Sequence, residues 1–304
     1  MRHPSQIRSL WTAIGGVPVL FLAIVAVQMR IDAQARATAR TQEELVLRSP
    51  SAVKQLSLGY DSLLADIYWT RAIQYYGERV ATEHAQFGLL WPLLDITTTL
   101  DPKLLVAYRF GAVFLAERGR GGAGRPDLAV QLVQRGIAAN PDDWHLHADL
   151  GFLYYWWLED YPKASAAYLE GSKVPKAPPL LKMMAARVAE KGGALETSRM
   201  IWSEIAASTK DPRIRKRAIE MMRGLKAQED EMHLDEFAEA YKKRFERYPS
   251  SGAELRDAGL LPGVPVDPEG YPYVFGPDGK SRLDPKSPVV IPPPVKSAPP
   301  ALRK

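Results

Sequence analysis

Between residues 50 and 248, apolar residues recur at every third or fourth position along almost the whole chain. This spacing places them on one face of an α-helix, and no segment shows convincingly the alternation that is typical of a half-buried β-strand. Proline follows an acidic or amide residue at Pro102, Pro141 and Pro212, and a proline there ends one helix or opens the next. The sequence therefore predicts an all-α body over residues 50–248.

A short motif recurs inside this region, in which an apolar residue and a glycine are followed one helical turn later by an aromatic residue. The two clear copies are Phe110-Gly111 with Phe114, and Leu150-Gly151 with Tyr154. At matching intervals after them come Ala129, Val133, Gly136 and Pro141 in the first copy, and Ala164, Tyr168, Gly171 and Pro175 in the second. A degenerate earlier copy holds Trp69, Ala72, Ile73, Tyr76, Leu90, Leu94 and Pro102, and a weak fourth lies between Met184 and Pro212.

These motifs resemble the tetratricopeptide repeat, whose first helix carries Leu-Gly and then an aromatic residue, and whose second helix carries small residues and a closing proline. The resemblance covers about half of the chain. It departs from the family pattern at an insertion over residues 119–125 and at a proline-rich break over residues 175–179. It implies a solenoid of helical hairpins with a concave groove that binds protein partners. A non-repetitive helical bundle is the alternative.

The resemblance also indicates which residues face that groove, because they occupy first-helix positions relative to Gly111 and Gly151. The predicted partner-binding residues are Leu105, Tyr108, Ala112, His145, Phe152, Tyr155 and Trp156. Aromatic side chains exposed in such a groove would anchor a partner segment. The alternative is that the aromatic residues near Tyr155 simply pack against neighbouring helices.

The amino-terminal segment contains no charged residue over residues 9–29, which Arg8 and Arg30 flank. At about 1.5 Å per residue, a helix of this length spans the roughly 30 Å hydrocarbon core of a bilayer. We therefore expect a short tail over residues 1–8, a transmembrane anchor over residues 9–29 and a stalk over residues 30–49. A cleaved signal peptide is the alternative.

Basic residues are nearly balanced on the two sides of the expected anchor, so the positive-inside rule gives only a slight preference. A short basic tail before a first membrane helix usually stays in the cytoplasm. We therefore expect a single-pass bacterial membrane protein whose soluble body is extracytoplasmic, in the periplasm. A cytoplasmic body is the alternative.

The composition changes beyond residue 248. Two turn signals, Asp267-Pro268-Glu269-Gly270 and Pro277-Asp278-Gly279, bracket a short aromatic strand, which predicts a small β-hairpin within residues 249–284. This segment resembles a tail seen on some membrane-anchored bacterial repeat proteins and is similar to the carboxy-terminal segment of type II secretion pseudopilins. Over residues 285–304, proline, serine and lysine dominate, which predicts a disordered or extended tail.

No feature of the sequence predicts an enzyme. The chain has no cysteine, which removes thiol chemistry and disulfides. His145 and His147 diverge on a helix and do not readily share a metal ion. The glycine-rich residues 119–125 lack the strand and the Lys-Ser/Thr pair of a nucleotide-binding loop, and the adjacent Glu159 and Asp160 do not face a common substrate. We therefore expect no catalytic residue, no metal and no cofactor.

The net charge of +5 is scattered rather than gathered in one block, which argues against nucleic acid as a partner. The expected function is a membrane-anchored scaffold that binds protein partners and supports assembly of a membrane or envelope complex. The alternatives are a component of a pilus or type II-like secretion apparatus, which the hairpin segment suggests, and an enzyme on a helical scaffold. The partner and the oligomeric state stay open.

Overall fold

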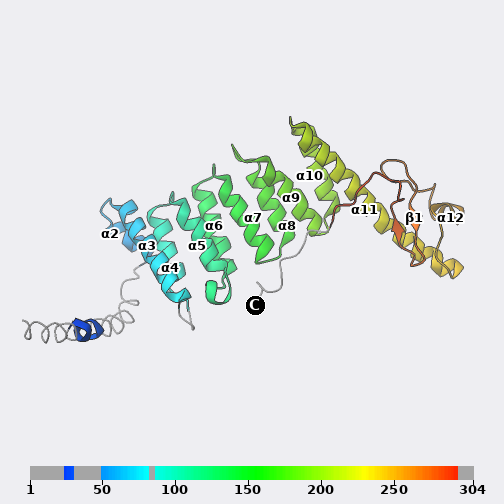
Figure 1. Ribbon diagram of the computed structural model, residues 1–304. Helices are drawn as coiled ribbons and strands as arrows, with labels where there is room; N and C mark the ends of the chain where they lie inside the picture. The colour runs from blue at the N-terminus through cyan, green and yellow to red at the C-terminus, as the bar shows by residue number, and fades with distance from the viewer. Residues whose placement is uncertain (1–23, 31–48, 82–85, 294–304) are drawn as a thin grey trace, which may run out of the picture. The chain divides into compact units, whose positions relative to one another are not determined.

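The computed structural model of the protein describes residues 24–30, 49–81 and 86–293 (Figure 1). Helices dominate these residues, which confirms the predicted all-α class at that level. Within the described ranges, none of the helices combines the length and the apolar character needed to cross a bilayer. Most of the predicted anchor, residues 9–29, and of the predicted stalk, residues 30–49, lies outside these ranges.

The described residues form two compact units: those up to Tyr75 together with Gly88–Asp101, and those from Tyr76 to Phe87 together with those from Pro102 onward. The helices of the first unit are α2 (Pro50–Leu56), most of α3 (Asp61–Val80) and α4 (Leu90–Leu100). Helix α2 packs against α4, and the Lys54 ammonium donates to the Thr99 carbonyl at 3.2 Å. The Tyr75 hydroxyl of α3 accepts a hydrogen bond at 3.3 Å from the Leu89 N–H, which links α3 to the start of α4.

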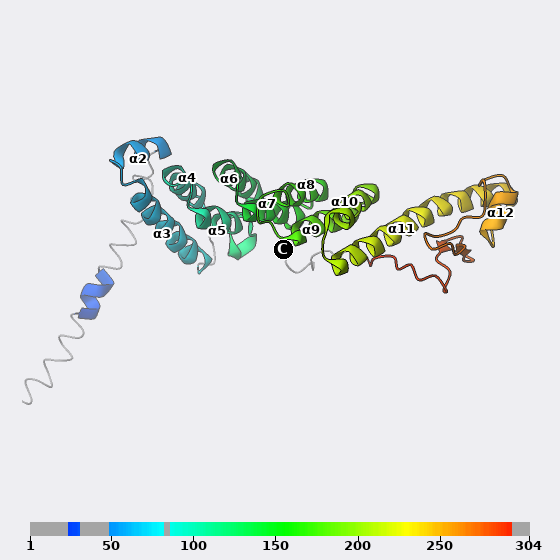
Figure 2. The same cartoon turned by 90° about the horizontal axis from the view of Figure 1, so that it is seen from above.

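The second unit holds a longer series of helices. They are α5 (Leu105–Ala116), the short 3₁₀ helix η1 (Gly119–Gly121), α6 (Pro126–Ala139), α7 (Trp144–Trp156), α8 (Tyr161–Gly171), α9 (Pro179–Lys191), α10 (Leu195–Ser208) and α11 (Pro212–Phe245). From α5 to α11, each α-helix packs against the next one along the chain, so that neighbours in sequence lie side by side in space (Figure 1 and Figure 2). Short connections favour this arrangement because they leave the chain no route to a more distant helix.

Aspartate side chains fix where three of these helices begin. Asp143, Asp160 and Asp211 each precede a helix and accept a hydrogen bond from a backbone N–H in its first turn, at distances of 2.8, 3.1 and 2.8 Å. A carboxylate at this position satisfies one of the four N–H groups that the helix itself leaves unpaired. The predicted boundary at Pro212 is confirmed, because α11 starts at that residue.

Glycine and tyrosine meet where consecutive helices approach each other. A Cβ atom added at Gly136 of α6 would lie 2.9 Å from the Tyr108 ring of α5, and one added at Gly151 of α7 would lie 2.8 Å from the Tyr168 ring of α8. Both tyrosines are buried. The motif therefore acts as the sequence predicts at Gly151, since the missing side chain makes room for an aromatic ring of the neighbouring helix.

The carboxy-terminal part of the second unit is built on α11, which is 34 residues long. A short helix α12 (Gly252–Asp257) and the strands β1 (Val274–Phe275) and β2 (Ser281–Arg282) follow it. The strands pair antiparallel with Val274 opposite Arg282, so the predicted hairpin is present. Its core joins Leu234 and Tyr241 of α11 to Leu255 and Tyr273.

The segment after the hairpin was predicted to be disordered or extended over residues 285–304, and its described part is ordered. Residues 285–293 form neither helix nor strand, yet Val289 and Pro292 are buried. No local pattern predicts which residues of this proline-rich stretch pack, because its composition alone carries no periodicity. Residues 294–304 lie outside the described part of the chain.

Replacing Gly151 tests the close approach of α7 and α8. A Gly151→Ala change gains helix propensity but places a methyl group 2.8 Å from the buried Tyr168 ring, so we expect a net loss of about 1–3 kcal/mol in the free energy of unfolding. Gly77→Ala is the matched control, because nothing lies within 4 Å of its Cβ position, and it should stabilise the chain by about 0.5–1 kcal/mol. Urea unfolding measures both, and a stabilised Gly151→Ala protein would contradict this packing.

Candidate protein-binding site

Two of the three predicted partner-binding residues of α5 are buried, and the exposed face of this helix carries other residues. Tyr108 and Ala112 are 0% and 2% exposed, so the prediction that they face a groove is wrong, and Leu105 is half-buried. The face of α5 opposite Tyr108 carries Val106, Phe110 and Val113, all of them exposed. Because a helix repeats every 3.6 residues, an error of two positions exchanges the buried face for the exposed one.

One stripe of α7 carries three of the other four predicted residues, of which Phe152 is exposed while His145 and Trp156 are half-buried. His145, Phe152 and Trp156 follow one another at intervals of seven and four, which places them on one stripe of the helix. Phe152 is 42% exposed, and its ring stacks on Trp156 with centroids 5.9 Å apart and meets the edge of Trp157 at 5.2 Å. His145 stacks on Trp144 at 3.6 Å and is held by the Asp143 carboxylate at 2.9 Å.

An ion pair joins the exposed stripes of α5 and α7. The Arg109 guanidinium lies 2.7 Å from the Asp149 carboxylate, and the hydrogen bond from Arg109 to Asp149 raises the pKa of the arginine. Asp149 lies one turn from both His145 and Phe152 on α7, and Arg109 lies beside Phe110 on α5. The bridge therefore places the two stripes on the same side of the unit. We call Val106, Phe110, Val113, Phe152 and Trp156 together the α5–α7 face.

Tyr155 differs from its neighbours on α7. Its hydroxyl accepts a hydrogen bond at 3.1 Å from the Lys191 ammonium, and that ammonium also lies 4.5 Å from the centre of its ring. The Tyr161 ring meets it edge-on at 5.9 Å. These contacts tie Tyr155 to the start of α8 and the end of α9, so it packs between helices, which was the alternative to a groove position.

A second exposed apolar surface lies in the first unit, at the turn between α2 and α3. Leu56, Leu58, Tyr60 and Leu63 are all exposed, and Leu58 reaches 86%. Leu58 also has a φ of +51°, a backbone conformation that is unfavourable for a residue other than glycine.

The glycine-rich residues 119–125 are occupied by contacts within the fold. The N–H groups of Ala123, Gly124 and Arg125 donate to the carbonyls of Phe114, Glu117 and Leu115 at 2.7 to 3.0 Å, and the Tyr76 hydroxyl donates to the Gly121 carbonyl at 2.6 Å. A phosphate cradle needs free backbone N–H groups. This segment is therefore a folded connector between α5 and α6.

The two histidines of α7 point in different directions, as the sequence predicts. His147 packs against Gly171 of α8, where a Cβ atom would lie 2.6 Å from the His147 side chain, and burial lowers the pKa of His147. Within the described residues, no group of three or more histidine, aspartate or glutamate side chains is arranged to hold a metal ion. Asp160 is a helix cap, which assigns a structural role to one of the two adjacent acids at positions 159 and 160.

Carboxylates of α11 hold the hairpin in place. The Asp235 carboxylate accepts hydrogen bonds from the Ser281 N–H at 2.7 Å and from the Lys280 ammonium at 2.9 Å, and Glu231 accepts from the Leu283 N–H at 3.1 Å. Tyr273 donates to Asp230 at 3.2 Å. Sequence reasoning missed these residues because they belong to a densely charged helix in which no single acid stands out.

Comparison with known proteins adds no family to these observations: no family model, no curated protein and no solved structure matches the chain.

The pH dependence of stability tests the anchoring of the carboxy-terminal segment. Hydrogen bonds from Ser250 and Arg247 lower the pKa of Glu254 to about 2, so the stability that it contributes is present above its ordinary pKa of 4.5 and is lost as the pH falls from there toward 2. Glu254→Gln should therefore be less stable than the unaltered chain at pH 7, with a difference that shrinks below pH 4.5. Urea unfolding at several pH values measures this, with Glu220→Gln as the control, and a difference independent of pH would contradict it.

Proposed function

We propose that this protein is a tetratricopeptide-type helical-repeat scaffold, anchored at a membrane, which binds protein partners through the α5–α7 face. The repeat assignment is supported by the packing of each helix from α5 to α10 against the next one. It is also supported by the contact of Gly151 on α7 with Tyr168 on α8, two positions that the motif assigns to one repeat. The membrane assignment is supported by the charge-free residues 9–29.

The observation that carries the proposal is the exposure of aromatic side chains beside an ion pair. Phe110 is 56% exposed, and Arg109 next to it is held by Asp149, which positions the neighbouring stripe that carries Phe152. Large apolar side chains on a rigid helical surface, rimmed by charged groups, are the features from which protein interfaces draw most of their affinity.

A double substitution tests this face. Phe110→Ala with Phe152→Ala removes two exposed rings and leaves the buried tyrosines untouched, so the fold should be retained. We expect a partner that co-purifies with the full chain in mild detergent to bind the double variant about 30-fold more weakly, which corresponds to a loss of roughly 2 kcal/mol. Met200→Ala, which shortens an exposed side chain on α10, is the control. The proposal would be contradicted if the full chain yields no stoichiometric partner, or if the double variant binds the partner with unchanged affinity.

Protease accessibility tests the proposed orientation. In a bacterial cell, protease should cleave the helical body once the outer envelope is opened and before the inner membrane is breached. The reason is that the short basic segment of residues 1–8 would hold the amino terminus in the cytoplasm. Immunoblotting of the full chain measures this. Cleavage that requires breaching of the inner membrane would instead place the scaffold in the cytoplasm.

A component of a pilus or type II-like secretion apparatus is the second candidate, and the hairpin within residues 249–284 favours it. In this structure β1 is flanked by β2 and by Ser251, which pairs with Val274, while β2 contacts α11. These contacts favour a structural role for the hairpin within this chain over a role in which it pairs with a strand of a partner. Deletion of residues 250–284 should abolish assembly if this candidate is correct, and unchanged assembly would dispose of it.

A further inference from the structure

The chain after β2 turns back and runs along α11 toward α9 (Figure 1 and Figure 2). Its course starts at Ser287, whose hydroxyl donates to the buried Asp267 carboxylate and accepts from the Val289 N–H at 3.1 Å. At its far end, the Arg187 guanidinium of α9 donates to the Pro293 carbonyl at 3.3 Å. Residues 287–293, which we call the tail strap, therefore lie across two helices of the body.

Gly224 is the point on α11 where the tail strap crosses. A Cβ atom there would lie 2.3 Å from the Val290 carbonyl oxygen and 2.7 Å from the Pro292 ring. Glycine within a helix costs about 1 kcal/mol relative to alanine, and Gly224 lies well inside α11. The backbone of the tail strap occupies the space that a side chain would fill, which gives the glycine a physical role.

The tail strap is held by few contacts. Only Val289 and Pro292 are buried, while Val290 is 73% exposed. In the part of the chain that the structure describes, residues 288–293 make no backbone–backbone hydrogen bond with α9 or α11. Proline has no N–H to donate, so its carbonyl is its only backbone hydrogen-bonding group. The Arg187 side chain donates to this group at Pro293.

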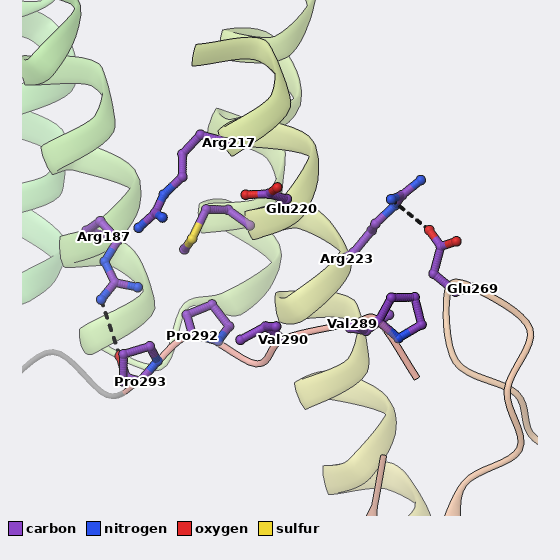
Figure 3. Close-up of a pocket in the computed structure, with 11 residues that line it drawn as sticks. Arg187, Arg217, Glu220, Arg223, Glu269, Val289, Val290, Pro292 and Pro293 are labelled. Atoms are coloured by element: carbon purple, nitrogen blue, oxygen red, sulfur yellow. Dashed lines mark hydrogen bonds and ion pairs between the residues drawn. The ribbon is translucent and has the colours of Figure 1, made fainter. Parts of the chain in front are cut away.

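A cavity remains beneath the tail strap. It has a volume of about 520 Å³ and is lined by Met221, Val289 and Pro292 together with charged residues of α9 and α11 (Figure 3). This pocket leaves room beside the tail strap, which a segment with a bulkier apolar residue would occupy.

The charges around the cavity have no counterpart on the tail strap. Arg187, Arg217 and Arg223 line it against two glutamates, Glu220 and Glu269. Arg223 pairs with Glu269 at 2.7 Å, whereas Arg217 has no ion-pair partner among the described residues and extends toward the Arg187 side of the cavity (Figure 3).

The tail strap itself carries no charged side chain over residues 287–293. A segment that brings a carboxylate to Arg217 would gain an interaction that the chain's own tail lacks.

From these observations we infer that the groove between α9 and α11 is a binding site for an extended, proline-containing peptide segment with an acidic residue, and that the chain's own tail strap occupies it until such a segment displaces it. This site is separate from the α5–α7 face and does not depend on the function proposed for that face. The tail strap competes as a tethered ligand, whose effective concentration is in the millimolar range for a short flexible connection.

A tail-release variant tests whether the groove accepts a peptide. Val289→Lys with Pro292→Lys removes both buried side chains of the tail strap and adds positive charge beside the arginines, so the strap should leave. The probe is a fluorescent synthetic peptide with the sequence of residues 284–295, titrated against full-length protein in mild detergent and followed by anisotropy. We expect the release variant to bind it about tenfold more tightly than the unaltered chain, for a peptide Kd near 0.1 mM.

Two full-length controls make this result decisive. Met232→Lys adds a positive charge at an exposed position of α11 that does not line the cavity and should behave like the unaltered chain. Gly224→Ala, added to the release variant, blocks the crossing point while favouring the helix, and should abolish peptide binding with helicity retained by circular dichroism. A release variant that binds no more tightly than the unaltered chain, or that still binds after Gly224→Ala, would overturn the inference.

The charge of the probe tests the acidic preference separately. A second peptide, in which Pro293→Glu puts a carboxylate at the end of the strap that contacts Arg187 and lies toward Arg217, should bind the release variant more tightly than the first at low salt. The difference should shrink as salt is raised because exposed charges are screened. Equal affinities at low salt would remove the acidic residue from the proposed ligand.

Discussion

The close approach of neighbouring helices at small residues is the constraint on which the second unit depends. Gly136 receives the Tyr108 ring and Gly151 receives the Tyr168 ring, so Tyr108 lies on the buried side of α5 and Gly151 on the buried side of α7. The stripes on the other sides of these helices face outward. The exposed position of Phe110 is therefore a consequence of packing on the opposite side of its helix, and the Arg109–Asp149 ion pair adds a link between the outward stripes.

Helix α11 connects this repetitive packing to the irregular carboxy-terminal segment. Its first half packs against α10 and carries Gly224 under the tail strap, and its second half presents Asp230, Glu231 and Asp235 to the hairpin. One long helix thus gives apolar packing at one end and hydrogen-bond acceptors at the other. Desolvation raises the pKa of Glu231, which shows that hairpin docking buries charge as well as apolar surface.

The two candidate surfaces of this unit differ in what covers them. The α5–α7 face carries the exposed rings of Phe110 and Phe152 on helices that pack through buried tyrosines. The α9–α11 groove is already covered, but by a strap with two buried side chains and a pocket beside it. The first surface offers affinity through exposed aromatic area. The second offers selectivity, since a ligand must outcompete a tethered segment.

The sequence by itself determined the helical class and several helix boundaries, because periodicity, aspartate caps and proline act over a few residues. It also indicated the small-residue contact at Gly151 and the hairpin. Tertiary structure decided which face of α5 is buried, since both faces carry apolar residues and a two-residue shift exchanges Tyr108 for Phe110. It also decided that Gly224 seats Val290 and that Asp235 holds Ser281, because such contacts join residues far apart in sequence that no local pattern pairs.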